Sequence, residues 1–394
     1  MGTINVMSIV FFCLIGAINI RLLYFLGDKR ISSRTAWYYG VATLTAAFLL
    51  QPIWLAQPRI ITSVFDEILP PLVCAAVVWL SGQLFLLPIF TALCLLASAT
   101  KKCGTEVAVN SLRISRRAFL QGSVLGAPLL AFGMGGKAVY EAMREMTLQQ
   151  LTVAFPDLPV TLDGFVIAQI SDAHLGPYFS LARLDETLAL VAQAKPDMLV
   201  ITGDLIGDMA LLRQGVKKIS DLAAGLKQKV YFCWGNHEYY HRIDEVRAEL
   251  EEAGIVILEN ESCHIKVGEG ELYLAGVDYP RGHKKEVEEK RLPFLEAALA
   301  EIPENTFHVL LAHHPDFLKE AFVKRVPLTL AGHTHGGQVK LFGRYLINFG
   351  YRYLAGLYQE GRSYGYVHTG TGQWLPLRVN CPPQVSLITL RKEG

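Results

Sequence analysis

The second half of the sequence places residue types that bind metals directly after short apolar runs. "AQISDAHLG" ends in Asp172 and His174, and "LAGHTHGG" ends in His333 and His335. Side chains two residues apart point to the same side of an extended chain, so each pair can face one cavity. Aspartate and histidine without cysteine are typical ligands for Mn²⁺, Fe or Zn²⁺.

Three more apolar runs end in residues of the same kind. "VITGDLIGD" supplies Asp204, "FCWGNHEYY" supplies Asn236 and His237, and "LLAHHPD" supplies His313 and His314. Most of these residues, taken alone, are more typical of a turn or a structural histidine. Five strand ends of this kind together predict one metal site, because ligands in open α/β sheets collect at the carboxyl ends of the strands.

Two divalent cations about 3.5–4 Å apart require a bridging carboxylate, and Asp204 is the candidate for that bridge. Such a pair lowers the pKa of a shared water and holds phosphoryl oxygens for an in-line attack. The residue types therefore favour hydrolysis of a phosphoester.

The series D-x-H, G-D, G-N-H-E, H-x-P-D and G-H-T-H-G-G-Q resembles the calcineurin-like metallophosphoesterase family over roughly residues 160–390. The resemblance implies a four-layer α-β-β-α sandwich with two metal ions. It also implies that His237 lies beside the metals and either protonates the leaving oxygen or stabilises the developing charge. The implied ligands are Asp172, His174, Asp204 and His335 for one metal, and Asp204, Asn236, His313 and His333 for the other.

Strand-like and helix-like runs alternate from residue 151 onward, which predicts an α/β domain over residues 151–394. Residues 1–150 contain the long apolar runs and form the predicted membrane anchor. The net charge is +6 for residues 1–150 and −5 for residues 151–394. A second half with a negative net charge is not typical of a general nucleic-acid-binding protein, so we expect no nucleic-acid partner.

Four apolar segments precede residue 140, and a membrane span needs about 20 such residues. They are Ile4–Leu26, Trp37–Ala56, Ile68–Ala99 and Phe119–Val139. Basic residues gather after the first and third segments, and the positive-inside rule assigns those loops to the cytoplasm. We therefore predict a four-span protein of the inner membrane with its second domain outside the cytoplasm.

"SRRAFLQG" places Arg116 and Arg117 before the fourth segment and resembles a bacterial twin-arginine export signal. The alternative is that the two arginines only set the topology. With the phosphoesterase motifs, this arrangement resembles the bacterial membrane-anchored, export-type members of the family. That resemblance implies phosphodiesterases that act at the cell surface or on lipid-linked substrates.

Several other residues are candidates for substrate contact. Arg281 and His283 could bind a substrate phosphate, with a solvated loop as the alternative. Aromatic residues and the 341–349 region could shape a lipid-facing mouth, with ordinary packing as the alternative. The aromatic residues are Tyr178, Phe179, Tyr239, Tyr240 and Trp374.

The sequence thus predicts a metal-dependent phosphoester hydrolase, with a phosphodiester favoured over a monoester by the resemblance alone. A hydrolase of phospholipids or lipid-linked pyrophosphates is the first alternative, because the anchor would hold the site near a bilayer. A catalytically silent metal-binding scaffold and a transporter with an accessory domain are alternatives from other classes. The substrate, the metal and the oligomeric state stay open.

Overall fold

In the computed structural model the chain divides into two compact units, Met1–Tyr140 and Glu141–Gly394. Helix α5 runs past this boundary, and its last residues pack with the second unit. Glu141 accepts a hydrogen bond from the backbone N–H of Asn380 at 2.6 Å, and Gln373 Nε2 donates to the carbonyl of Ala142 at 2.8 Å. The division at residue 150 stays a prediction. The structure describes residues 6–26, 32–50, 64–103, 116–144, 146–345, 347–348, 350–373 and 375–393.

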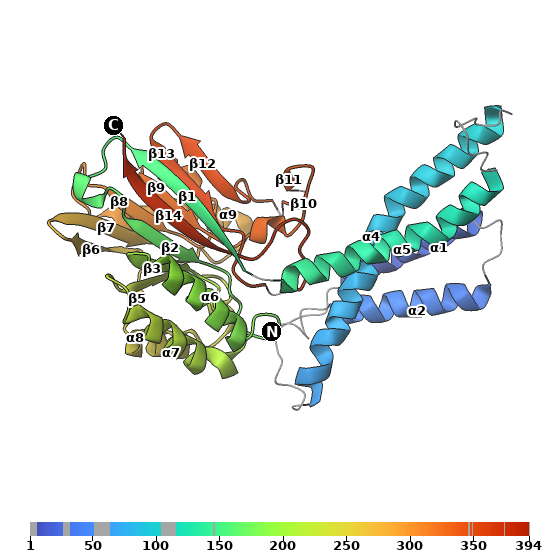
Figure 1. Cartoon of the computed structure of the whole chain (residues 1–394), viewed down its shortest axis with the longest axis horizontal. Helices are drawn as coiled ribbons and strands as arrows, with labels where there is room; N and C mark the ends of the chain where they lie inside the picture. Colours follow the sequence, from blue (N-terminus) through green and yellow to red (C-terminus); the bar gives the residue numbers. More distant parts are fainter. Residues whose placement is uncertain are drawn as a thin grey trace. The chain divides into compact units, whose positions relative to one another are not determined.

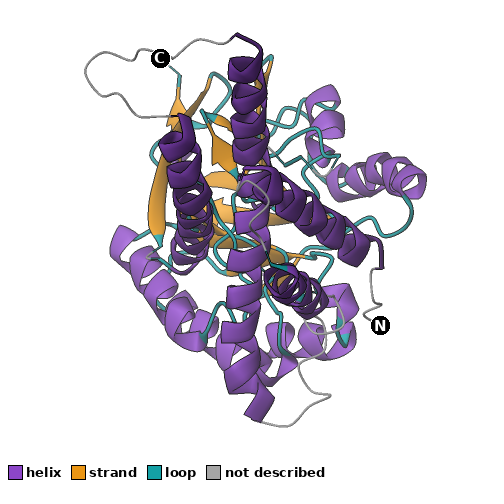
Figure 2. Ribbon diagram, turned by 90° about the vertical axis from the view of Figure 1, so that its right-hand side faces the viewer, coloured by secondary structure: helices purple, strands orange, loops and turns teal. Residues whose placement is uncertain are grey.

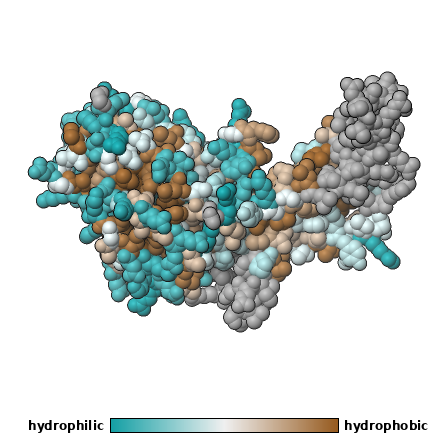
Figure 3. Space-filling view, viewed as in Figure 1, coloured by the Kyte–Doolittle hydropathy of each residue, from teal (hydrophilic) through white to brown (hydrophobic). Residues whose placement is uncertain are grey.

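The first unit is helical (Figure 1) and consists of α1 (Val6–Leu26), α2 (Ser33–Leu49), α4 (Val64–Cys103) and the greater part of α5 (Arg116–Met143). Ala46 and Ala47 of α2 pack against Ala76 and Leu80 of α4, and small residues of this kind let helices approach closely. Apolar residues, brown in Figure 3, are visible on the described part of this unit. The exposed apolar residues of α1 include Met7, Val10, Phe11 and Leu14.

One helical segment within the described residues, Pro71–Ala92, is long and apolar enough to cross a membrane. A shorter apolar stretch lies at Met7–Leu22. The expectation of four spans is therefore not supported by the described helices. Helix α2 has only 17 residues, and the predicted span Trp37–Ala56 continues into residues outside the described part. The third predicted segment lies within one continuous helix, α4, despite its internal prolines.

The second unit contains two six-stranded sheets and a two-stranded hairpin. Its strands are drawn in orange in Figure 2. The first sheet has the order β1 (Thr147–Phe155), β14 (Gln384–Lys392), β2 (Val166–Ile170), β3 (Met198–Thr202), β4 (Val230–Cys233) and β5 (Val256–Ile257). The second has the order β12 (Gly356–Glu360), β13 (Ser363–Val367), β9 (Leu328–Ala331), β8 (His308–Leu311), β7 (Gly270–Gly276) and β6 (Glu261–Val267). The hairpin joins β10 (Lys340–Leu341) to β11 (Arg344–Tyr345).

Helices cover the outer face of each sheet. The first sheet packs on α6 (Leu181–Ala194), α7 (Leu212–Ala223) and α8 (Ile243–Glu252), and the second on α9 (Lys284–Leu299) and α10 (Phe317–Val323). In α6 the buried Leu184, Leu188 and Val191 follow the helical period and form its sheet-facing stripe. Ser180 caps the helix by accepting from the backbone N–H of Arg183.

The two sheets enclose a core of their own. Along β3, Met198 and Val200 point into the core shared with the second sheet, whereas Leu199 and Ile201 point to the helices. This alternation follows from the two-residue period of a strand, and burial on both faces explains the continuous apolar runs. The predicted mixed α/β architecture is confirmed, and the layers run helix, sheet, sheet, helix.

The central strands are parallel and end in register. Ile170 of β2 pairs with Ile201 of β3, and Thr202 of β3 pairs with Cys233 of β4. In the second sheet Leu311 of β8 pairs with Leu330 of β9. The loops that leave these five strands therefore start at neighbouring points, and they carry the predicted metal-binding residues.

Candidate metal centre

The loops after the central strands hold five of the predicted ligands in a left-handed backbone conformation. The φ angles are 54° for Asp172, 47° for His174, 51° for Asp204, 77° for His333 and 49° for His335. Positive φ is uncommon outside glycine and costs roughly 1–3 kcal/mol per residue, so it persists only where the surrounding structure enforces it. Its concentration at these positions marks the strand ends as a functional site.

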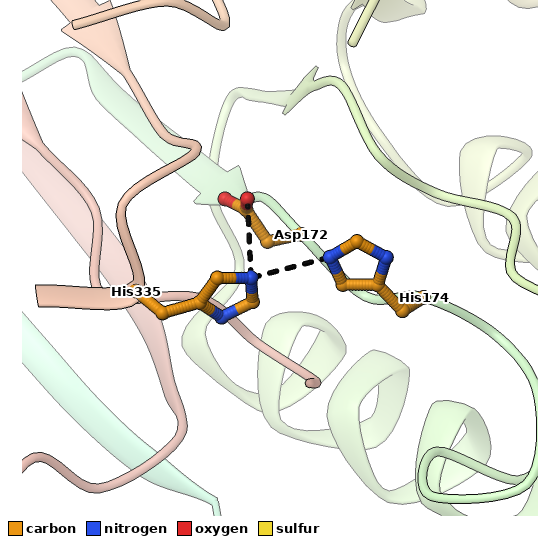
Figure 4. Close-up of side chains that lie close together, drawn as sticks. All are labelled: Asp172, His174 and His335. Carbon is orange, nitrogen blue, oxygen red and sulfur yellow. Dashed lines mark hydrogen bonds and ion pairs between the residues drawn. The ribbon is translucent and has the colours of Figure 1, made fainter. Parts of the chain in front are cut away.

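One ligand cluster is formed by Asp172, His174 and His335 (Figure 4). Nε2 of His335 lies 3.5 Å from Oδ1 of Asp172 and 3.2 Å from Nε2 of His174. Asp172 is held in turn by the backbone N–H of His333, which donates to both carboxylate oxygens at 2.9 and 3.0 Å. Three ligand atoms from two sheets thus converge on one point.

A second cluster is formed by Asp204, His313 and His333. Nε2 of His313 lies 3.2 Å from Oδ2 of Asp204 and 3.0 Å from Nδ1 of His333. The same Oδ2 of Asp204 lies 3.6 Å from Nε2 of His174, which belongs to the first cluster. Asp204 therefore stands between the two clusters, where a bridging ligand is required.

Asn236 and His237 complete the centre. Oδ1 of Asn236 is buried and has no hydrogen-bond partner, which is uncommon for a buried amide and fits a metal ligand. His237 groups with His174 and Asp204, and the ring centroids of the two histidines are 4.4 Å apart. Its backbone N–H donates to Oδ1 of Asp204 at 2.8 Å, so Oδ2 is free to face the ligands.

A cavity of about 300 Å³ opens onto this centre. It is large enough for a phosphoryl group and part of its ester, and both ligand clusters contribute to its wall. The lining residues are His174, Asp204, Asn236, His237, His333, Thr334, His335, Gln338 and Tyr351.

The electrostatics of the centre suit a bound cation. Burial lowers the pKa of His174, His333 and His335 well below the usual histidine value, so these rings are neutral and can donate a lone pair. Burial also disfavours a charged His313, but Asp204 and Asp172 outweigh it and raise the pKa of that ring to about 10. A proton on His313 thus offsets the two carboxylates, and a divalent cation would do the same.

Glu238 is a residue of the centre that the sequence reasoning quoted but gave no role. Its buried carboxylate accepts the backbone N–H groups of Asp204 at 3.0 Å, Leu205 at 2.7 Å and Gly235 at 3.0 Å. It thereby fixes the loops after β3 and β4 relative to each other. The only indication of this role in the sequence is its position directly after His237 in G-N-H-E.

Arg378 and Tyr351 were missed, and no local motif marks them. The guanidinium of Arg378 is fully buried and donates to the carbonyls of Gly372 at 2.8 Å and Thr369 at 2.9 Å, with Nδ1 of His335 at 3.4 Å. It therefore supports the loop behind His335 from the C-terminal segment. The hydroxyl of Tyr351 lies 2.6 Å from Nε2 of His333.

Two other candidates from the sequence lie beside the ligand clusters. The exposed Tyr240 accepts from Nδ2 of Asn236 at 3.4 Å, and the ring of His314 stacks on that of His333 with the centroids 5.8 Å apart. His314 accepts from the backbone N–H of Asp316 at 3.2 Å, which is a structural contact. Arg281 is exposed, with its guanidinium carbon 3.9 Å from the centroid of the Tyr239 ring, and the exposed His283 caps α9. Neither belongs to the described lining of the cavity. Tyr178 and Phe179 are buried, and Trp374 lies outside the described residues.

Comparison with known proteins agrees with this geometry. Residues 165–337 match the family model of the calcineurin-like phosphoesterases. An uncharacterized metallophosphoesterase of Bacillus subtilis, YkuE, is 31% identical over 290 residues, which cover 71% of this chain and 98% of that protein. A zebrafish transmembrane protein with a metallophosphoesterase domain is 30% identical over 75% of this chain and 67% of its own length.

Among solved structures, a dimetal phosphatase from zebrafish aligns with a TM-score of 0.32 and 14% identity, over 53% of this chain and 88% of that one. The sequence relationships decide the family, because the Bacillus protein is matched over nearly its whole length. The chain belongs to the calcineurin-like phosphoesterase family and is a hydrolase of phosphoric esters.

Proposed function

We propose that the protein is a phosphodiesterase that uses two divalent metal ions. The observation that carries the proposal is the position of Asp204, whose Oδ2 lies 3.6 Å from His174 and 3.2 Å from His313. The first ion would be held by Asp172, His174, Asp204 and His335, and the second by Asp204, Asn236, His313 and His333. When bound, such ions lower the pKa of a shared water and offset the charge of the phosphoryl oxygens. Mn²⁺, Fe and Zn²⁺ all suit this set of ligands.

The chain's own residues orient the reaction. His237 lies beside His174 and lines the cavity, so its ring can donate to an oxygen of the bound phosphoester. Burial lowers the pKa of His237, which favours the neutral ring with a single N–H donor. Glu238 and Arg378 hold the loops that carry the ligands, and their buried contacts limit the movement of the site.

The test is hydrolysis by the purified, intact protein with each metal in turn. We expect turnover of a soluble aryl phosphodiester with Mn²⁺, and slower turnover of the matching monoester. His237→Ala should lower kcat about 100-fold or more, because a positioned donor contributes at least that much. His264→Ala is the matched control, since His264 is an exposed ring on β6 that pairs with Glu271. Unchanged turnover in His237→Ala would reject the role of that residue.

We further propose that the helical unit anchors the enzyme in the inner membrane with the phosphoesterase domain outside the cytoplasm, as in the bacterial export-type branch. Support comes from the apolar helix Pro71–Ala92, from the basic residues after the first and third apolar segments, and from relatives named as transmembrane proteins. The topology of four spans is part of this proposal. Reporters fused after the last residue test it, because an alkaline phosphatase fusion is active only outside the cytoplasm and a cytoplasmic reporter would show the opposite arrangement.

A phosphoester carried on a lipid, including a lipid-linked pyrophosphate, is the second candidate substrate. An anchored site would meet such substrates in the bilayer. A panel of phospholipids and nucleotide diphosphate lipids in mixed micelles, compared with soluble diesters, decides between the two classes of substrate.

A further inference from the structure

The β10–β11 hairpin ends in an aromatic side chain that contacts no core. Leu341 pairs with Arg344, so Phe342 and Gly343 form a two-residue turn. The side chain of Phe342 is 101% exposed. Both turn residues have positive φ, 50° for Phe342 and 77° for Gly343. Turns of this kind favour asparagine or aspartate before glycine, so a phenylalanine is locally unfavourable there and buries nothing in return.

The hairpin presents a cationic surface, formed by Lys340 and Arg344, in a domain whose net charge is negative. Lys340 and Arg344 flank the turn, and Arg352 follows a few residues later. The sequence has no aspartate or glutamate from Pro327 to Gln359, whereas residues 151–394 as a whole have a net charge of −5. An aromatic tip between two cations matches the boundary between acyl chains and anionic headgroups.

This surface is joined directly to the metal centre. The segment between Gln338 and Tyr351 contains the hairpin, and both of these residues line the metal-binding cavity. Tyr351 contacts His333, and the loop of His335 packs closely on the segment. A Cβ on Gly337 would lie only 1.9 Å from the carbonyl oxygen of Ile347. The hairpin therefore belongs to the rim of the cavity rather than to a separate lobe.

The connection between the helical unit and the phosphoesterase domain is short. Helix α5 ends at Met143 and β1 begins at Thr147, so the phosphoesterase domain follows the helical unit without a long linker. If that unit is embedded as proposed above, the surface of the bilayer is present at a high effective concentration. Charge and tethering together favour a lipid surface over a soluble protein as the partner.

We propose that the β10–β11 hairpin docks on an anionic bilayer, with Phe342 inserted at the headgroup boundary and with Lys340 and Arg344 on lipid phosphates. Docking places the rim of the metal-binding cavity at the membrane surface, where phosphoesters carried on lipids can reach it. This inference rests on the proposed membrane anchoring and deepens the proposed function.

The experiment measures lipid contact in the intact protein. A fluorescent amino acid is incorporated at position 342 of the full chain, which is reconstituted in nanodiscs that contain doxyl-labelled lipid, with or without phosphatidylglycerol. The probe should be quenched strongly in the anionic discs and weakly in the neutral ones. The matched control carries the probe at Val160, which is 78% exposed on a different element, η2 (Val160–Leu162). Equal quenching at both positions would overturn the inference.

Charge reversal tests the cations. Each basic residue at an anionic surface strengthens partitioning by about fivefold, so K340E/R344E should shift the docking equilibrium by roughly 25-fold or more and abolish the quenching at 342. Quenching that persists in this variant contradicts the proposal, and so does quenching that is equally strong in anionic and in neutral discs. An unquenched probe in every disc also contradicts it and directs the search to a protein partner.

The same discs separate this inference from the proposed function. Turnover of the soluble diester is measured with the unmodified chain in both kinds of disc and should not depend on lipid charge, because a soluble substrate reaches the cavity without docking. Soluble turnover without quenching rejects the docking and leaves the proposed function in place. Quenching without turnover supports the docking and rejects the phosphodiesterase assignment.

Discussion

The hydroxyl of Tyr351 lies 2.6 Å from Nε2 of His333, while Nδ1 of the same ring faces Nε2 of His313 at 3.0 Å. If Nε2 carries the proton and donates it to the hydroxyl oxygen, Nδ1 keeps its lone pair on the side of the second ligand cluster. Contacts of this kind fix the tautomer and the orientation of a ligating histidine.

Tyr351→Phe should therefore weaken binding of the second metal by about tenfold, because outer contacts of ligating histidines typically contribute that much or more. Calorimetric titration of the metal-free protein with Mn²⁺ measures the change. Tyr353→Phe is the control, since its ring packs on Phe322 and Tyr358 rather than on a ligand. Equal affinities for both variants would show that the hydroxyl does not position His333.

Asp204→Asn should lower the metal content of the protein more than a substitution of any residue that binds only one of the two ions. The substitution keeps the size of the side chain but removes the charge that both clusters share. We expect less than one bound ion per chain and no measurable turnover, with metal content determined by mass spectrometry. Asp221→Asn is the control, because Asp221 forms an exposed pair with Lys217. Two ions bound to Asp204→Asn would rule out a bridging role.

Glu238→Gln should lower the free energy of unfolding and weaken the connection between the loops after β3 and β4. An amide cannot accept three backbone N–H groups as a carboxylate does, and its own NH₂ group would meet one of those donors. Hydrogen bonds to a charged group contribute about 1.5–3 kcal/mol each, so a loss of a few kcal/mol is expected in urea unfolding. Glu271→Gln, an exposed partner of His264, should change stability little. Equal midpoints in urea for the two variants would argue against this role.

Metal affinity should depend on pH in two steps. Burial raises the pKa of Asp172 to about 6 in the metal-free protein. Burial lowers the pKa of His313, but Asp204 and Asp172 reverse the effect and raise it to about 10. Metal binding must displace the proton of His313 below pH 10 and that of Asp172 as well below pH 6.

Affinity should thus rise about tenfold per pH unit between pH 6 and pH 10, and about a hundredfold per unit below pH 6. Calorimetry in buffers with different ionisation enthalpies counts the released protons. One proton is expected at pH 8 and close to two well below pH 6. Release of no proton at pH 8 would contradict the raised pKa of His313.

The sequence indicated the candidate ligands because each follows an apolar run and because five such strand ends occur together. Taken alone, most of these residues are more typical of a turn or a structural histidine. Asp172 with His174, and His333 with His335, could be paired from their spacing alone. The rest depends on contacts between distant segments. Tyr351 and Arg378 reach the centre from loops with no motif, and only the folded chain shows that they touch His333 and His335.

The helical unit was harder to predict for a physical reason. Apolar composition shows that a segment avoids water, but it does not separate a lipid-facing helix from one buried against its neighbours. Asn19, Thr43 and Gln83 illustrate this point, because all three are buried inside the helical unit. Nδ2 of Asn19 donates a hydrogen bond to the carbonyl of Gln83, and Nε2 of Gln83 donates to Oγ1 of Thr43. Polar side chains of this kind break an apolar pattern without preventing a helix.

The position of β14 has a consequence for biosynthesis. This strand, Gln384–Lys392, lies between β1 and β2, in parallel with the first and antiparallel to the second. Among the described residues β1 therefore has no sheet neighbour until residues 384–392 have been translated. While the ribosome still holds these residues, β1 and β2 expose unpaired edges, and a nascent chain in that state depends on chaperones or on rapid completion to avoid aggregation.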